Sequence, residues 1–141
     1  MADNAPITAS GSTLRCIVVT PEETVVDRDA NFVALPLFDG ELGVALYHAP
    51  MIGRLGFGEL RVRTGTTEER FYVDGGFVQV ADNVVSVLTN RSIPAKKLDA
   101  ATIDQQVREV GSSVVAGETA LALRERQLKQ LRAQSRVAGK G

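Results

Sequence analysis

The residues that could do chemistry in this chain are few, and several of them share one short stretch. Residues 39–50, DGELGVALYHAP, hold the single histidine, His48, and the carboxylates Asp39 and Glu41. Acid–base catalysis by His48 would need a nucleophile or a carboxylate held beside it, and no recognised motif links these residues. The glycine and proline breaks favour a loop or packing role for His48, and an enzyme that uses His48 is kept as an alternative.

The spacing of the residues does not predict a metal site or a phosphate site. One histidine and one cysteine, Cys16, provide no paired zinc ligands, and the apolar run around Cys16, LRCIVVT, predicts a buried thiol. The glycines of GFGEL (56–60) and DGGF (74–77) lack the Lys-Ser/Thr of a P-loop. They predict turns with positive φ, and YVDGGFVQV (72–80) predicts two strands joined through such a turn.

Short apolar runs separated by turn residues fill residues 14–88 and predict the elements that hold the histidine stretch. In ELRVRTG (59–65), Leu60 and Val62 alternate with arginines, which is the period of a half-buried strand. Many short strands at this spacing predict a β-sandwich or a barrel. The length of 141 residues suits one such domain with a small appendage.

A helical period begins after Pro94. Apolar residues fall on two helical stripes, and GSSVVAG (111–117) interrupts the first and suggests a turn; the members are Ile103, Val107, Val110 and Val114, then Leu121, Leu128 and Leu131. Asp99 or Thr102 can cap the first helix. The pattern predicts a helical hairpin, and we expect it to depend on docking because isolated helices of this length are marginal.

Charge is divided unevenly along a chain whose net charge is −1. From Glu118 onwards, six basic and two acidic residues give +4, which leaves −5 for the rest. Such a division indicates a partner for one end or a solvated helix face, and the near-neutral total argues against nucleic acid. No signal peptide is expected, because the start is neither basic nor apolar. No apolar run reaches the ~20 residues of a membrane span, so a soluble, cytoplasmic protein is expected.

Several segments, in order, resemble one known family. LRCIVVTPEETVVD resembles its opening strand pair, and GELGV followed by HAP resembles its Gly-Glu-Leu-Gly-Ile and Gly-His-Ala-Pro segments. FYVDGGFVQVADNVVSVLTN is similar to its Gly-Gly strand pair, and LDAATI precedes a basic helix as in the family. Over residues 14–136 the chain resembles the epsilon subunit family of the rotary F-type ATP synthase, called delta in mitochondria.

The resemblance implies a fold and a function. The fold is a β-sandwich of about ten short strands followed by a C-terminal α-helical hairpin; here the sandwich spans residues 14–93 and the hairpin 94–141, after a flexible tail of residues 1–13. The implied function is that of a non-catalytic central-stalk subunit. Its partners are the gamma subunit, the c-subunit ring and, when the hairpin extends to inhibit ATP hydrolysis, the alpha/beta head. It lies peripherally at the cytoplasmic face of the inner membrane, with no nucleic acid and no direct membrane insertion.

The resemblance also implies contact residues. The turn that faces the c ring is Asp39, Gly40, Glu41, Leu42 and Gly43, and the segment towards gamma is His48, Ala49 and Pro50. The basic residues that meet an acidic loop of the head are Arg124, Arg126, Lys129, Arg132 and Arg136.

Two departures from the family pattern change these expectations. Leu46-Tyr47 replaces the usual Pro-Gly before His-Ala-Pro, and since tyrosine does not take a glycine conformation cheaply, a different loop is expected. Leu98 and Asp99 match the start of an Ile/Leu-Asp-x-x-Arg-Ala nucleotide motif, but Thr102-Ile103 replaces Arg-Ala. Loss of that arginine removes a phosphate contact, so no cofactor is expected and ATP binding by the hairpin is doubtful.

The main competing interpretation is a small β-sandwich module that binds a ligand or peptide and oligomerises through its helical tail. Its signature would be exposed aromatic residues along a groove. The aromatic residues lie mostly in strand runs and are expected in the core, which weighs against this interpretation; they are Phe32, Phe38, Tyr47, Phe57, Phe71, Tyr72 and Phe77.

Overall fold

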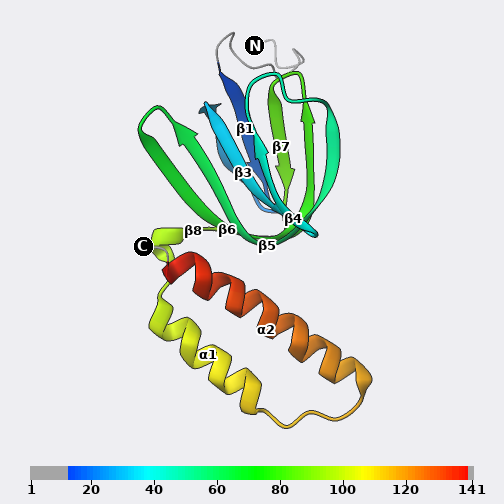
Figure 1. The fold of residues 1–141 in the computed structure, drawn as a ribbon. Coiled ribbons are helices and arrows are strands. Elements are labelled where there is room, and N and C mark those ends of the chain that lie inside the picture. Colours follow the sequence, from blue (N-terminus) through cyan, green and yellow to red (C-terminus); the bar gives the residue numbers. More distant parts are fainter. Residues whose placement is uncertain (1–12, 140–141) are drawn as a thin grey trace.

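The computed structural model describes residues 13–139, which form a strand-rich portion followed by two helices (Figure 1). The expected tail, residues 1–13, lies outside the described residues except for its last member. The elements in chain order are β1 (Leu14–Val19), β2 (Thr24–Ala30), β3 (Phe32–Leu37), β4 (Gly40–Val44), β5 (Met51–Thr64), β6 (Thr67–Ala81), β7 (Val84–Leu88), β8 (Ser92–Pro94), the 3-10 helix η1 (Ala95–Lys97), α1 (Ala100–Ser112) and α2 (Glu118–Gly139).

The strands form one sheet that folds over on itself into the predicted sandwich (Figure 1). The strand order is β2-β1-β7-β6-β5-β3-β4, with β8 paired to β6, and the β1–β7 pair is parallel while the others are antiparallel. Leu60 and Val62 are buried in the core, which confirms the predicted alternation. Cys16 is buried there as well, and burial raises the pKa of its thiol to about 12, as expected of an inert cysteine.

The expected two strands and tight turn over residues 72–80 are wrong. β6 runs without a break from Thr67 to Ala81, and its pairing with β5 continues across Gly76. Gly75 and Gly76 do have positive φ, 73° and 109°, but they bend the strand and do not reverse it. β6 pairs with β8 before the bend and with β7 after it. The described residues hold eight strands where about ten were expected, because β5 and β6 are single strands of 14 and 15 residues.

The helical hairpin follows the sequence pattern at its start and departs from it at the tip. Asp99 is the N-cap of α1, since its side chain accepts a hydrogen bond from the backbone N–H of Ala101. Ile103 is buried as predicted, but Val114 is 99% exposed. The helical stripe was wrong for Val114 because α1 ends at Ser112 and the next residue is extended.

The hairpin contacts the sandwich chiefly through α2. α2 packs against β5 and β6, and Figure 1 shows it on the sandwich side of the hairpin, with α1 beyond it. Ala133 and Val137 of α2 are buried against Tyr72 of β6 in a second, small apolar cluster, with Phe57 at its margin. Docking of the hairpin thus depends on the last turns of one helix.

Candidate functional site

The segment expected to be a turn facing the c ring is mostly strand. Asp39 lies in the tight turn at the start of the edge strand β4, whereas Gly40, Glu41, Leu42 and Gly43 belong to β4 and pair with β3. Asp39, Gly40, Glu41 and Gly43 are exposed and Leu42 is partly buried. Glu41 Oε1 lies 3.4 Å from Arg61 Nη2, so its carboxylate is oriented by an exposed ion pair. This edge of the sheet presents strand backbone and one oriented carboxylate to the surroundings.

The segment expected to meet gamma begins beyond the other end of β4. The backbone N–H of Tyr47 donates to Asn83 Oδ1 at 2.6 Å, and this bond holds Tyr47 at a φ of 66°. Tyr47 therefore takes a positive φ despite its side chain, and the hydrogen bond to Asn83 offsets part of the cost. His48 Nδ1 lies 2.7 Å from its bonding partner, the carbonyl oxygen of Ala49, while Ala49 and Pro50 are exposed.

Within the part of the chain that the structure describes, the loop does not place a nucleophile or a carboxylate within hydrogen-bond distance of His48, which an enzymatic role would need. The hydrogen bonds of His48 within residues 13–139 go to the carbonyl oxygens of Ala45 and Ala49. Asp39 lies at the opposite end of β4, about 16 Å along a five-residue strand. The fold therefore separates the histidine from the turn that carries Asp39. No three His, Cys, Asp or Glu side chains within residues 13–139 gather to hold a metal ion.

The five basic residues expected to meet the head divide into two groups. Arg124 Nη1 donates to the carbonyl oxygen of Ser113 at 2.9 Å, so it ties α2 to the hairpin tip. The other four line a pocket of about 1200 Å³ between α2 and the sandwich, namely Arg126, Lys129, Arg132 and Arg136.

A buried polar contact joins α2 to β6 at Asp74. Asp74 is 7% exposed, and its Oδ1 accepts from Tyr72 Oη at 2.8 Å and from Gln130 Nε2 at 2.9 Å. Arg91 Nη2 lies 3.5 Å from the other carboxylate oxygen. Burial of the phenol, and then its bond to Asp74, raise the pKa of Tyr72 well above its usual value.

A second polar contact joins β6 to the end of α2. Arg70 Nε donates to Glu59 Oε2 at 2.7 Å, and Arg70 Nη2 donates to the carbonyl oxygen of Val137. That bond satisfies one of the carbonyls that a helix C-terminus leaves without an intrahelical partner. We call the residues that make these two contacts the docking cluster: Arg70, Tyr72, Asp74 and Gln130.

Comparison with known proteins decides the family. The beta-sandwich domain of the ATP synthase Delta/Epsilon chain matches residues 13–95, more than half of the chain. The chain belongs to the ATP synthase delta/epsilon family.

Two relatives agree with this assignment. An ATP synthase epsilon chain of Rhodopirellula baltica is 64% identical over 86 residues, which cover 61% of this chain and 67% of the relative. A sodium ion specific epsilon chain of Propionigenium modestum is 32% identical, and the match covers 81% of this chain and 79% of the relative.

Two mitochondrial assemblies contain chains of the same fold. One is the OSCP/F1/c-ring structure of Euglena gracilis ATP synthase, with a TM-score of 0.82, 20% identity, and 97% and 90% of the two chains covered. The other is the central stalk/c-ring structure of Tetrahymena thermophila, with a TM-score of 0.70, 14% identity, and 93% and 99% covered.

Leu98 and Asp99, which were expected from the resemblance to match the start of a nucleotide motif, lie immediately before α1. The Asp99 carboxylate accepts from the backbone N–H of Ala101 at 3.2 Å and from Thr102 Oγ1 at 2.6 Å. These bonds lower the pKa of Asp99. Leu98 packs against the small apolar cluster under α2. Both matching residues thus have structural roles as helix cap and packing contact.

Three aromatic side chains expected in the core lie on the surface. Phe38 is 71% exposed, Phe77 is 58% exposed and Tyr47 is 80% exposed. Phe77 alternates with the buried Val78, so a strict period-two count along β6 would have placed it outside. The sequence analysis also missed the docking cluster. The signal that could have located this contact is the pair Ala133 and Val137, two apolar residues four apart among the polar residues of α2.

No helix in residues 13–139 combines the length and the apolar character needed to cross a membrane.

Proposed function

We propose that this chain is a non-catalytic central-stalk subunit of an F-type ATP synthase. It joins the gamma subunit to the c ring and turns with both during proton-driven ATP synthesis, at the cytoplasmic face of the inner membrane and without a cofactor. The family match over residues 13–95 carries the proposal. The titles of the two similar structures, which name F1/c-ring and central stalk assemblies, add support.

The edge strand β4 and the loop that follows it provide the proposed contacts of the sandwich. Residues 39–43 face the c ring, where Glu41 is oriented by Arg61 to meet a basic or polar ring loop. Residues 48–50 face gamma, on a loop that Asn83 fixes through the Tyr47 backbone. Backbone-held loops of this kind suit a rigid coupling, because little ordering remains to be done on binding.

The hairpin is the proposed inhibitory element. It leaves the docking cluster and extends into the alpha/beta head, where Arg124, Arg126, Lys129, Arg132 and Arg136 meet an acidic loop. The small size of the α2 contact supports this role, since only Ala133, Gln134 and Val137 of α2 are buried among the described residues. An element held by few contacts changes position at low energetic cost.

Reconstitution of the complex tests both parts of the proposal. The complex is assembled without the chain, with the full chain, and with a chain that ends after Lys97. We expect ATP-driven proton pumping to need the chain and to survive truncation, while hydrolysis rises several-fold on truncation. Pumping without the chain would refute the stalk role. Unchanged hydrolysis on truncation would refute inhibition and leave the stalk role standing.

A further inference from the structure

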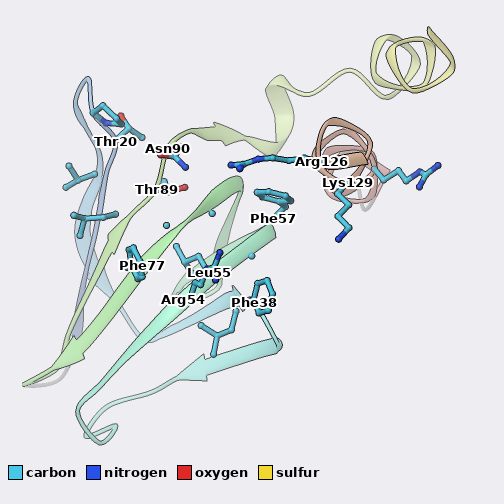
Figure 2. Close-up of a pocket in the computed structure, with 18 of the residues that line it drawn as sticks. Thr20, Phe38, Arg54, Leu55, Phe57, Phe77, Thr89, Asn90, Arg126 and Lys129 are labelled. Carbon is cyan, nitrogen blue, oxygen red and sulfur yellow. The ribbon is translucent and has the colours of Figure 1, made fainter. Parts of the chain in front are cut away.

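A groove lies between α2 and the outer face of the sandwich while the hairpin is docked, and the function proposed above uses its basic residues only after the hairpin has extended. Its volume is about 1200 Å³, and Figure 2 shows Phe38, Arg54 and Phe77 across the strands, with Arg126 and Lys129 projecting from α2 on the other side. The groove therefore has two unlike sides, a floor of strands and a wall of helix.

The floor is a row of three exposed apolar side chains on the outer face of the sheet, with Arg54 between Phe38 and Phe77 and its guanidinium 4.9 Å from the ring centre of Phe38. The Phe38 N–H donates to the Arg54 carbonyl oxygen at 2.8 Å, Arg54 pairs with Phe77, and Phe77 pairs with Leu88. Directly paired residues point to the same face, so the row runs from Phe38, just after β3, across β5, β6 and β7. Phe38, Phe77 and Leu88 are 71%, 58% and 57% exposed. Exposed apolar residues grouped in this way mark interaction surfaces.

The wall is basic. The four cations lining the groove from α2 recur every three or four residues, on one side of the helix, and Arg54 adds a fifth from the floor; the four are Arg126, Lys129, Arg132 and Arg136. Glu125 is the one carboxylate in the lining. None of the five cations forms an ion pair within residues 13–139. Their charge is available to a partner.

We propose that this groove binds an acidic amphipathic segment of a partner protein. The apolar side of the segment covers the row of Phe38, Phe77 and Leu88, and its carboxylates face the α2 cations. The wall from Ala122 to Arg136 is about 21 Å long at 1.5 Å per residue, which matches about four turns of a partner helix. Apolar anchors on one side and opposite charge on the other are the features of helix-in-groove recognition.

Binding in this groove favours the docked hairpin. The floor belongs to the sandwich and the wall belongs to α2, so the complete groove exists only while α2 is docked. A segment that binds the complete groove must therefore stabilise docking by the same coupling free energy with which docking strengthens binding. Arg126 already reaches the sandwich side, where its guanidinium lies 5.7 Å from the ring centre of Phe57.

A designed peptide tests the groove on the isolated full chain. The probe is a labelled peptide of about 18 residues, about 27 Å as a helix, with leucine on one face and glutamate on the other. Its controls are a scrambled peptide and one with lysine in place of glutamate. We expect saturable binding of the amphipathic acidic peptide alone, by fluorescence anisotropy, and greater hydrogen-exchange protection of residues 130–137.

Variants of the chain locate the binding. Phe77→Ser and the double change Arg126→Glu with Lys129→Glu should each weaken binding at least tenfold. Arg108→Glu, a charge reversal at an exposed position of α1, should change it less than twofold. No binding, or equal binding of the scrambled peptide, overturns the proposal.

Other occupants give different results. Tripolyphosphate that binds the same cations, while the acidic peptide does not, would assign the groove to a small anion. Concentration-dependent dimers that Phe77→Ser abolishes, without peptide binding, would assign it to a second copy of the chain. These measurements require neither the gamma subunit nor an ATP hydrolysis assay. The groove proposal can therefore be refuted while the stalk proposal stands, and the reverse.

Discussion

Tyr72 connects the sandwich to the docked helix through one buried phenol. Its side chain is 0% exposed, and its hydroxyl donates to Asp74 while Ala133 and Val137 pack beside it. An ionised phenol in this position would lose its solvation and face a carboxylate. The neutral form is therefore favoured in the folded protein, and the pKa of Tyr72 is raised.

The raised pKa of Tyr72 predicts an alkaline loss of stability. Below about pH 10, the usual tyrosine pKa, the phenol is neutral in both states. Above that pH the unfolded chain loses the proton first, so the free energy of unfolding falls as the pH rises, by at most about 1.4 kcal/mol per pH unit. The buried Cys16, whose pKa is also raised, would add an alkaline slope of its own, so the background is Cys16→Ala with Tyr47→Phe. Urea titrations at pH 8–11.5 should show the slope in this background and a shallower one on adding Tyr72→Phe. Equal slopes in the two proteins would contradict the prediction.

The bend of β6 is the feature of a single element that shapes the sandwich. Gly76 has a φ of 109°, and a Cβ atom there would lie 1.9 Å from the carbonyl oxygen of Leu88. A side chain is unfavourable there for two reasons. L-residues rarely adopt this φ, and the atom that the Cβ would meet belongs to the backbone, which cannot easily move away. The bend lets one strand pair with β8 on one side of Gly76 and with β7 on the other.

Gly76→Ala is expected to destabilise the protein by about 2–4 kcal/mol, through backbone strain and the clash with Leu88. The measurement is the free energy of unfolding from urea titration. Gly111→Ala is the matched control, since Gly111 lies inside α1 with open space around it. That change should be stabilising by about 0.5–1 kcal/mol. Equal effects of the two changes would show that the bend does not require glycine.

The sequence pattern predicted elements better than it predicted their connections. Alternation around Leu60 and the Asp99 cap are local signals, and both were correct. Gly75-Gly76 is compatible with a hairpin turn and with a bend, and what distinguishes the two is the pairing of β6 with strands farther along the chain. The docking cluster was unpredictable for the same reason, because Asp74 and Gln130 are 56 residues apart in sequence.

The whole molecule has two parts of unequal stability. The sandwich core contains seventeen buried residues in one cluster, whereas α2 adds Ala133 and Val137 to a cluster of three buried residues. Full burial of a valine contributes about 1.5–3 kcal/mol, so the apolar share of docking is a few kcal/mol at most. Polar contacts at Asp74 and Arg70 add to it, and water can replace them when α2 leaves. The hairpin should therefore detach before the sandwich unfolds.

Ala133→Glu should detach the hairpin and leave the sandwich folded. Ala133 is 1% exposed and lines a small pocket beside Glu59, so a new carboxylate there would be buried near a like charge. Hydrogen exchange should speed up across residues 118–139, with trypsin cleaving after Arg126, while strands β1–β7 keep their protection. Gln127→Glu adds the same charge at an exposed position of α2 and should change neither measurement. If the strands lose protection together with α2, helix and sandwich unfold as one cooperative unit. A hairpin that switches position must detach while the sandwich stays folded, so this result would contradict the switch.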